Sequence, residues 1–152
     1  MDEHIRIFNG ETITIETGAQ VDANLNDLTW WMGKHNGYAT REMVDLLMTE
    51  YSLDVAEREI TPKFWGTESQ RKRWLKMKYV KAPLFIRPFA NFFVGYVLKA
   101  GFLDGKEGFI WHTLQGFAYR FLVDAKIFEL KKHFNFDDER IKAYLKEKYF
   151  TS

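Results

Sequence analysis

Hydrophobic and polar residues alternate at the start of the chain, in two short runs that are typical of β-strands. The runs cover residues 4–8 and 11–16 and are separated by Asn9 and Gly10. An Asn-Gly pair favours the two-residue turn of a β-hairpin, because both turn positions need a positive φ. The pattern therefore predicts one hairpin, and it predicts no further strand downstream.

The hydrophobic period changes at Leu25. From there the apolar residues recur at steps of three and four, which is the spacing of one face of an α-helix. Asp27 is a suitable N-cap, because its carboxylate can accept a hydrogen bond from a backbone N–H of the first turn. Gly33 and Gly37 each disfavour a helix by about 1 kcal/mol relative to alanine. Since the apolar stripe keeps its phase across both glycines, the sequence predicts a single helix over 25–51.

Proline and glycine divide the rest of the chain into further predicted helices. Residues 52–67 contain Pro62 and Gly66 and are expected to form a linker, or a short helix with a loop. Three glycines within residues 101–108 predict a turn between two apolar helices. The helices themselves are predicted at 70–81, 89–100, 109–133 and 137–149. The predicted fold class is therefore mainly α with a small N-terminal β-hairpin.

The composition fits one globular domain with an unusual share of aromatic residues. A chain of 152 residues can bury a core, and its lack of cysteine excludes disulfides and thiolate metal sites. The acidic residues 1–4 are not followed by an apolar stretch, so we expect no secretory signal there. Aromatics make up 17% of the chain, and 12 of the 26 lie between Phe85 and Phe128.

Charge is segregated along the chain, although the net charge is only +1. Residues 1–60 hold 4 basic against 12 acidic side chains, whereas residues 61–152 hold 18 against 9. Eight basic residues and the single acid Glu68 lie between Lys63 and Arg87. Such asymmetry favours an anionic partner for the basic part of the chain, and the alternative is a folded dipole without a partner.

The apolar run 82–100 is too interrupted to span a membrane. Arg87 and Lys99 lie within it, and the helix predicted after Pro88 would extend about 18 Å, against roughly 30 Å of hydrocarbon. Basic residues beside aromatic helices instead predict a peripheral helical surface on anionic lipid. The alternative is an ordinary helical hairpin packed as core. The residues expected to face lipid are Arg71, Lys72, Lys76, Lys78, Phe89, Phe92, Phe93 and Tyr96.

Four segments together carry a resemblance to a known enzyme family. They are MDEHIRIFNG, LTWWMGKHNGYATRE, QRKRWLK and GFLDGKEGFIWHTLQGFAYRFLVDAKIFE. The chain resembles, from residue 1 to about 133, family 2 glycosyltransferases of the bacterial lipopolysaccharide-core and capsule type. The resemblance implies the C-terminal portion of a GT-A glycosyltransferase with amphipathic membrane-surface helices. Residues 1–67 would end the catalytic domain, and residues 68–152 would form the basic, aromatic, membrane-associated region.

The resemblance also implies an activity, and it places part of that activity outside the chain. Such enzymes transfer a sugar from a nucleotide-sugar donor to a lipid-linked or lipopolysaccharide glycan acceptor. The sequence has neither strand–helix alternation nor an Asp-x-Asp motif. The nucleotide sugar, and the magnesium or manganese ion implied for the whole enzyme, would therefore bind a missing N-terminal domain, and we expect no cofactor in this chain. The implied location is peripheral, on the cytoplasmic face of the bacterial inner membrane.

Two other classes of protein compete with the enzyme fragment. A stand-alone membrane-surface adaptor needs only the basic and aromatic helices, without catalysis. A nucleic-acid-binding protein is disfavoured, because the aromatic residues lie downstream of the cations rather than among them, and no recognisable module is present. The genomic sequence upstream of Met1 would distinguish the enzyme fragment from the adaptor.

The resemblance assigns catalytic and sugar-binding roles near the start of two segments. Glu3 is the predicted general base that takes the proton of the acceptor hydroxyl, with Asp2 as its neighbour or alternate. Without the resemblance, the two acids would be solvated charges. Gln70, Arg73 and Trp74 match a Gln-x-x-Arg-Trp motif, in which the indole stacks on a sugar and the guanidinium meets phosphate. The alternative is a basic interfacial helix anchored by Trp74.

Three further residues are candidate substrate contacts. Lys34 and His35 lie on the first predicted helix, where the histidine is either a substrate contact or a hydrogen-bonded core residue. Asp104, in the glycine-rich turn, either lines the acceptor entrance or forms a structural turn. The other histidines show no ligand spacing, so no zinc site is predicted.

Overall fold

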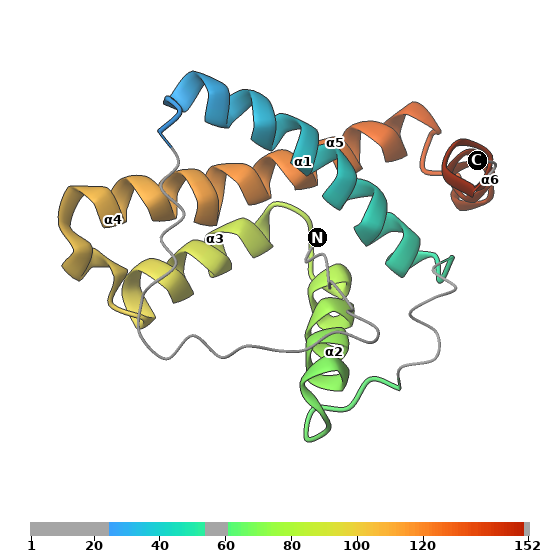
Figure 1. Ribbon diagram of the computed structural model, residues 1–152. Coiled ribbons are helices and arrows are strands. Elements are labelled where there is room, and N and C mark those ends of the chain that lie inside the picture. The colour runs from blue at the N-terminus through green and yellow to red at the C-terminus, as the bar shows by residue number, and fades with distance from the viewer. Residues whose placement is uncertain (1–24, 54–60, 151–152) are drawn as a thin grey trace, which may run out of the picture.

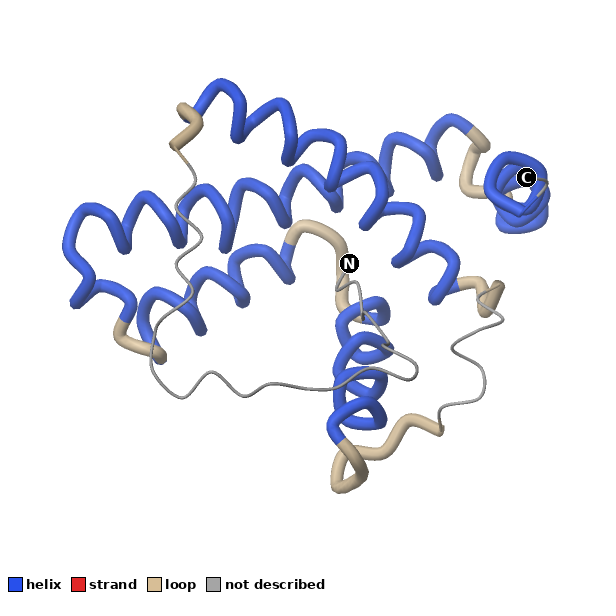
Figure 2. The backbone as a smooth tube through the Cα atoms, in the orientation of Figure 1, coloured by secondary structure: helices blue, strands red, loops and turns tan. Residues whose placement is uncertain are grey.

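The computed structural model describes residues 25–53 and 61–150, and every regular element within these ranges is helical (Figure 2). The mainly α prediction is confirmed, whereas the hairpin predicted at 4–16 lies outside the described residues. The elements are α1 (Leu28–Glu50), α2 (Glu68–Lys81), α3 (Ile86–Phe92), the π-helical η1 (Phe93–Leu98), the 3₁₀-helical η2 (Gly101–Asp104), α4 (Gly105–Trp111), the π-helical η3 (His112–Ala118), α5 (Tyr119–His133) and α6 (Asp138–Phe150).

Helix α1 forms as the sequence predicts. Asp27 caps it, because its Oδ1 accepts a hydrogen bond of 2.9 Å from the backbone N–H of Trp30. The helix continues through Gly33 and Gly37, and around both glycines the space is open to at least 4 Å. The prediction of one uninterrupted helix is therefore confirmed.

The predicted aromatic helices form a long helical hairpin, which is called the hairpin from here on. One arm is α3 continued by η1, and the other is α4 continued by η3 and α5 (Figure 1). The first arm begins at Ile86 rather than at residue 89, because Pro88 lies in the first turn, where a missing N–H is tolerated. The turn predicted at 101–108 is also shorter, since the second arm begins at Gly105. Gly108 serves packing instead: a Cβ there would lie 2.4 Å from the carbonyl oxygen of Gly101.

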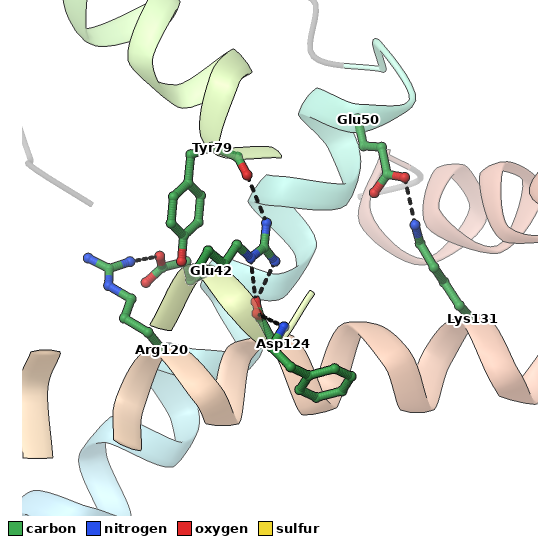
Figure 3. A network of polar contacts seen from close by, with 8 residues as sticks. Glu42, Glu50, Tyr79, Arg120, Asp124 and Lys131 are labelled. Atoms are coloured by element: carbon green, nitrogen blue, oxygen red, sulfur yellow. Dashed lines mark hydrogen bonds and ion pairs between the residues drawn. The ribbon is translucent and has the colours of Figure 1, made fainter. Parts of the chain in front are cut away.

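The hydrophobic core lies where α1 crosses α5, and α6 packs beside them (Figure 1). Two ion pairs join α1 and α5, one between Glu42 and Arg120 and one of 2.6 Å between Glu50 and Lys131 (Figure 3). Helix α1 from residues 1–67 and helices α5 and α6 from residues 68–152 thus share one core. Its buried apolar residues are Ala39, Met43, Val44, Leu46, Leu47, Leu53, Tyr119, Val123, Ile127, Ile141 and Leu145.

A buried ion pair joins the start of α3 to α5. The side chain of Asp124 is fully buried and that of Arg87 is 4% exposed, and the Nε–H of Arg87 donates to Asp124 Oδ1 at 2.6 Å. Asp124 Oδ2 accepts from the backbone N–H of Phe85 at 2.8 Å, and Arg87 also donates to the carbonyl oxygen of Tyr79 (Figure 3). Arg87 is therefore a structural cation, although it lies within the basic run 63–87.

None of the helices in the described ranges combines the length and apolar character that crossing a membrane would need. This agrees with the expectation that the run 82–100 does not span. The described residues contain no sheet, so they do not bear on the GT-A assignment.

Candidate functional site

The hairpin carries aromatic residues on the side of α5 that faces away from α1. Tyr119, Val123 and Ile127 are spaced by four residues and pack against α1. Phe121 and Phe128 lie on another face of the same helix and remain partly exposed. The helix therefore has two apolar faces, of which α1 covers one.

The phenylalanines of this second face touch one another in a continuous row, which we call the aromatic row. Its successive ring centroids are 4.7 to 5.9 Å apart, within the range of favourable edge and tilted ring contacts. The row runs across both arms of the hairpin and ends beyond α5. Its members, in order of contact, are Phe89, Phe117, Phe121, Phe85, Phe128 and Phe136.

More apolar side chains are exposed towards the tip of the hairpin. Globular proteins rarely expose contiguous apolar patches of more than a few hundred Å², and larger patches mark surfaces for proteins or membranes. We call the aromatic row and the exposed apolar side chains towards the tip together the apolar face of the hairpin. Its other exposed residues are Ile86, at the start of α3, and, at and near the tip, Phe93, Val94, Val97, Leu98, Phe102, Leu103, Phe109, Ile110 and Trp111.

The four aromatic residues expected to face lipid divide into two pairs. Phe89 and Phe93 are 59% and 52% exposed and belong to the apolar face. Phe92 and Tyr96 are half-buried and stacked on each other, with ring centroids 5.2 Å apart. Phe92 also contacts Phe117 of the other arm, so this second pair holds the two arms together.

The cations of α2 have different surroundings. Lys76 forms a 3.0 Å ion pair with Asp45 of α1, and Lys72 pairs with Glu68 one turn earlier. Arg71 and Lys78 are exposed, and the ammonium group of Lys78 lies 5.5 Å from the ring centre of Trp74. Arg71 and Lys78 are therefore the predicted lipid-facing cations for which a role in holding α2 is least evident.

The Gln-x-x-Arg-Trp residues lie on α2, and Gln70 has a structural role there. Its side-chain oxygen accepts a 3.0 Å hydrogen bond from the backbone N–H of Thr67, and the backbone N–H of Gln70 donates to the Thr67 hydroxyl. This reciprocal capping starts the helix. Trp74 is half-buried against Phe64, and Arg73 is half-buried as well. None of the three lines the groove described next.

A groove of about 560 Å³ separates the start of α1 from the second arm of the hairpin. It brings Lys34 and His35 together with residues almost eighty positions away. Aromatic and amide side chains dominate its walls, together with one lysine, one histidine and one aspartate. The lining residues are Asn26, Asp27, Leu28, Trp30, Trp31, Lys34, His35, Tyr38, Trp111 and Gln115.

His35 has a fixed orientation in this groove. Its ring stacks on Trp31 with centroids 3.6 Å apart and meets the edges of Tyr38 and Tyr119. Nδ1 lies 2.9 Å from the carbonyl oxygen of Trp31, and since a carbonyl can only accept, Nδ1 carries the proton of this bond. His35 is thus both hydrogen-bonded to its own helix and part of the groove wall.

Behind His35, a hydroxyl joins the groove to the α1–α5 contact. The Tyr119 hydroxyl donates to Glu42 Oε2 at 2.7 Å. Burial, followed by this hydrogen bond and the negative charge of Glu42, raises the pKa of Tyr119 well above its ordinary 10.0. The hydroxyl therefore stays protonated and supports the wall against which His35 packs.

The other groove residues offer rings, a cation and an amide. The Lys34 ammonium lies 4.6 Å from the ring centre of Trp30 and 5.4 Å from that of Tyr38. Trp111 lies opposite and is more than half exposed. The Gln115 side-chain oxygen is buried and finds no hydrogen-bond partner among the described residues. Gln115 also lines a second, smaller pocket between η1 and η3, so it lies between the two.

The remaining predicted site residues lie elsewhere. Asp104 is exposed at the tip of the hairpin, immediately before α4, and does not line the groove. Asp2 and Glu3 lie outside the described residues. Within the described ranges no cluster of histidine, aspartate and glutamate is suited to hold a metal ion. His112 is packed instead against Gly95 and Gly101, where a Cβ would approach its ring to 2.8 and 2.2 Å.

Sequence reasoning did not identify Trp30, Trp31, Trp111 and Gln115 as site residues. The first two stand beside Lys34 in the sequence, so their proximity was an available signal. No spacing rule connects them with Trp111 and Gln115. Only the path of the hairpin past α1 brings the two segments together.

Comparisons with protein-family models, with curated proteins and with solved structures found no match for this chain.

Proposed function

We propose that this chain is the acceptor-side, membrane-attachment part of a family 2 glycosyltransferase. It would lie peripherally on the cytoplasmic face of a bacterial inner membrane. The whole enzyme would transfer a sugar from a nucleotide-sugar donor to a lipid-linked or lipopolysaccharide glycan. The glycosyltransferase part rests on the resemblance of the four sequence segments. The membrane part rests on one structural observation, which is the apolar face of the hairpin.

The physical argument for lipid is the size and chemistry of that face. It combines aromatic rings with aliphatic side chains, and the hairpin itself leaves them uncovered. Moving a half-exposed phenylalanine out of water contributes about 1 kcal/mol, so a few such rings suffice for reversible attachment. Exposed cations of α2 add about 1 kcal/mol each where they reach anionic headgroups. A lipid surface supplies both kinds of contact.

The acceptor argues for such a location. A glycan on a lipid carrier is confined to the membrane surface, and an enzyme held there encounters it without leaving the interface. The nucleotide sugar and the divalent metal would bind the N-terminal domain expected from the resemblance. The alternative is a membrane-surface adaptor without catalysis, for which the apolar face of the hairpin and the exposed cations of α2 would suffice.

Vesicle flotation tests the membrane part. The chain is expected to float with vesicles of phosphatidylglycerol and phosphatidylethanolamine. A Phe89→Ser/Phe93→Ser variant should lower the partition coefficient at least about tenfold, because two exposed rings are lost. Leu25→Ser is the matched control, since Leu25 is 95% exposed but lies outside the hairpin.

Unchanged flotation of the double variant, with the control behaving alike, would exclude the apolar face as the lipid contact. Circular dichroism of the variants checks that the helices are intact, so a loss of binding can be assigned to the surface.

A further inference from the structure

We infer that the groove between the start of α1 and η3 binds an uncharged saccharide. The inference deepens the proposed function, on which it rests for its biological role, because it names the chemistry of the acceptor that the chain holds. It concerns residues of α1, α4 and η3. The resemblance assigns substrate contacts to Lys34 and His35 among them, and none to the others. Apart from Trp111, which belongs to both surfaces, the residues of the groove are not those of the apolar face of the hairpin.

The groove presents several aromatic faces within one small volume. Trp30, Trp31, Tyr38 and Trp111 all line it, from two segments of the chain. The face of an indole carries partial negative charge, whereas the C–H bonds on one side of a pyranose carry partial positive charge. A sugar ring can therefore lie flat on an indole. Trp111 and Trp30 are the exposed rings available for this contact.

The polar groups of the groove suit hydroxyl groups. Gln115 lines the groove, and its side-chain oxygen is buried without a partner among the described residues. A rotation of this side chain towards the groove would let a ligand hydroxyl donate to the oxygen, which stabilises an unsatisfied acceptor. Asn26 and Lys34 add amide and ammonium groups to the same walls. Apolar faces combined with a few fixed polar groups are typical of small-molecule sites.

The charge of the groove argues against a phosphate-rich ligand. Lys34 is its only full cation among the described lining residues, and Asp27 supplies one opposite charge. The ammonium of Lys34 already lies over Trp30 and Tyr38. A nucleoside diphosphate carries at least two negative charges, and one lysine beside one aspartate neutralises little of that charge. A neutral saccharide requires neither.

Nuclear magnetic resonance of the indole N–H groups tests the inference on the full chain. The probes are cellobiose, lactose and chitobiose, added to about 20 mM, which is well above a millimolar Kd. We expect the indole signals of Trp30, Trp31 and Trp111 to shift with at least one of the three. The Trp65 signal is the internal control, because Trp65 is 94% exposed and lies outside the groove.

Variants at the groove sharpen the test. Trp30→Ala and Gln115→Leu should each weaken saccharide binding by roughly tenfold, because they remove a stacking face or the buried acceptor. Trp65→Ala is the matched control and should bind like the parent. If no saccharide shifts the groove indoles, or if both groove variants bind like the parent, the inference is overturned. Stronger shifts with uridine diphosphate would overturn it too, by showing an anion site.

The saccharide inference and the membrane proposal fail separately. Trp30→Ala should float with vesicles like the parent, and Phe89→Ser/Phe93→Ser should bind the saccharide like the parent. Loss of saccharide binding alone would leave the membrane surface intact as a proposal. Loss of flotation alone would leave the groove intact.

Discussion

Asp124 lies at the centre of the polar contacts that join α2, α3 and α5 (Figure 3). Its carboxylate accepts from Arg87 and from the backbone of Phe85. Because both side chains of the ion pair are buried, each depends on the other for its solvation. The pair fixes where α3 begins and thereby sets the path of the first arm of the hairpin.

Removing one member of this pair should be much more damaging than removing both. Asp124→Ala is expected to lower the free energy of unfolding by about 3–5 kcal/mol, because Arg87 is left buried without its anion. Urea denaturation measures the loss, with Glu68→Ala as control, since its partner Lys72 is exposed and such pairs contribute below about 1 kcal/mol.

A second variant keeps this prediction testable if Asp124→Ala does not fold. Arg87→Met/Asp124→Leu replaces both charges by apolar groups and should recover most of the stability. A single variant as stable as the parent, or a double variant less stable than the single one, would contradict the interpretation.

The Tyr119 hydroxyl predicts how stability depends on alkaline pH. Burial raises the pKa of Tyr119 above 10.0, so near pH 10 the unfolded chain loses this proton before the folded chain does. The contribution of Tyr119 is therefore fully present below pH 10 and declines as the pH rises further. Tyr119→Phe should lose stability less steeply between pH 9 and 11 in urea titrations. Parallel curves for parent and variant would disprove this assignment.

At the scale of elements, the two glycines of α1 are unusual residues for exposed positions within a helix. Gly33 and Gly37 have no atom near their absent side chains. Gly33→Ala and Gly37→Ala should therefore each raise the free energy of unfolding by about 0.5–1 kcal/mol. Gly108→Ala is the contrasting control and should destabilise, because its Cβ would meet the carbonyl oxygen of Gly101. Thermal denaturation of the three variants decides the matter, and destabilisation by all three would contradict the account of α1.

The helices could be predicted because the sequence signals for each helix lie within the helix itself or beside its ends. The three-and-four spacing from Leu25 and the cap at Asp27 are contained within a few turns, and the structure confirms both. The boundaries near Pro88 and Gly105 were wrong, because a proline in a first turn and a glycine in a close contact resemble helix breakers in sequence. The contact that decides the role of Gly108 comes from the tertiary packing of the tip.

The groove and the burial of Arg87 could not be predicted for a related reason. Arg87 pairs with Asp124 across 37 positions, and Trp31 and Gln115, which line the same groove, are more than eighty positions apart. No periodicity reaches that far. The sequence did predict that Lys34 and His35 are candidates for substrate contact, and the structure brings both to one groove without testing that role.

At the scale of the whole molecule, binding of the proposed nucleotide-sugar donor to this chain can be measured directly. The sequence contains no Asp-x-Asp motif, and the described residues contain no acidic cluster for a metal. The isolated chain is therefore expected to show no measurable binding of uridine diphosphate sugars in calorimetry with magnesium or manganese. A micromolar, metal-dependent site would contradict the proposed division into a donor domain and this acceptor side.

The last prediction concerns how charge and apolar contact combine in membrane attachment. Attraction between exposed cations and anionic lipid is screened by salt over about 8 Å at physiological ionic strength, whereas insertion of rings hardly depends on salt. Arg71→Gln/Lys78→Gln should therefore weaken flotation with anionic vesicles at low salt by about 2 kcal/mol, or roughly thirtyfold. The same variant should differ much less from the parent at 0.5 M salt or on neutral vesicles.

Lys76 provides the informative comparison for this test. Its ammonium pairs with Asp45 of α1, so Lys76→Gln should lower the free energy of unfolding slightly and affect flotation less than the double variant does. Phe89→Ser/Phe93→Ser should weaken flotation at both salt concentrations, since its loss is apolar. If Arg71→Gln/Lys78→Gln floats with anionic vesicles as well as the parent does at low salt, α2 faces something other than lipid. Attachment would then rest on the hairpin alone.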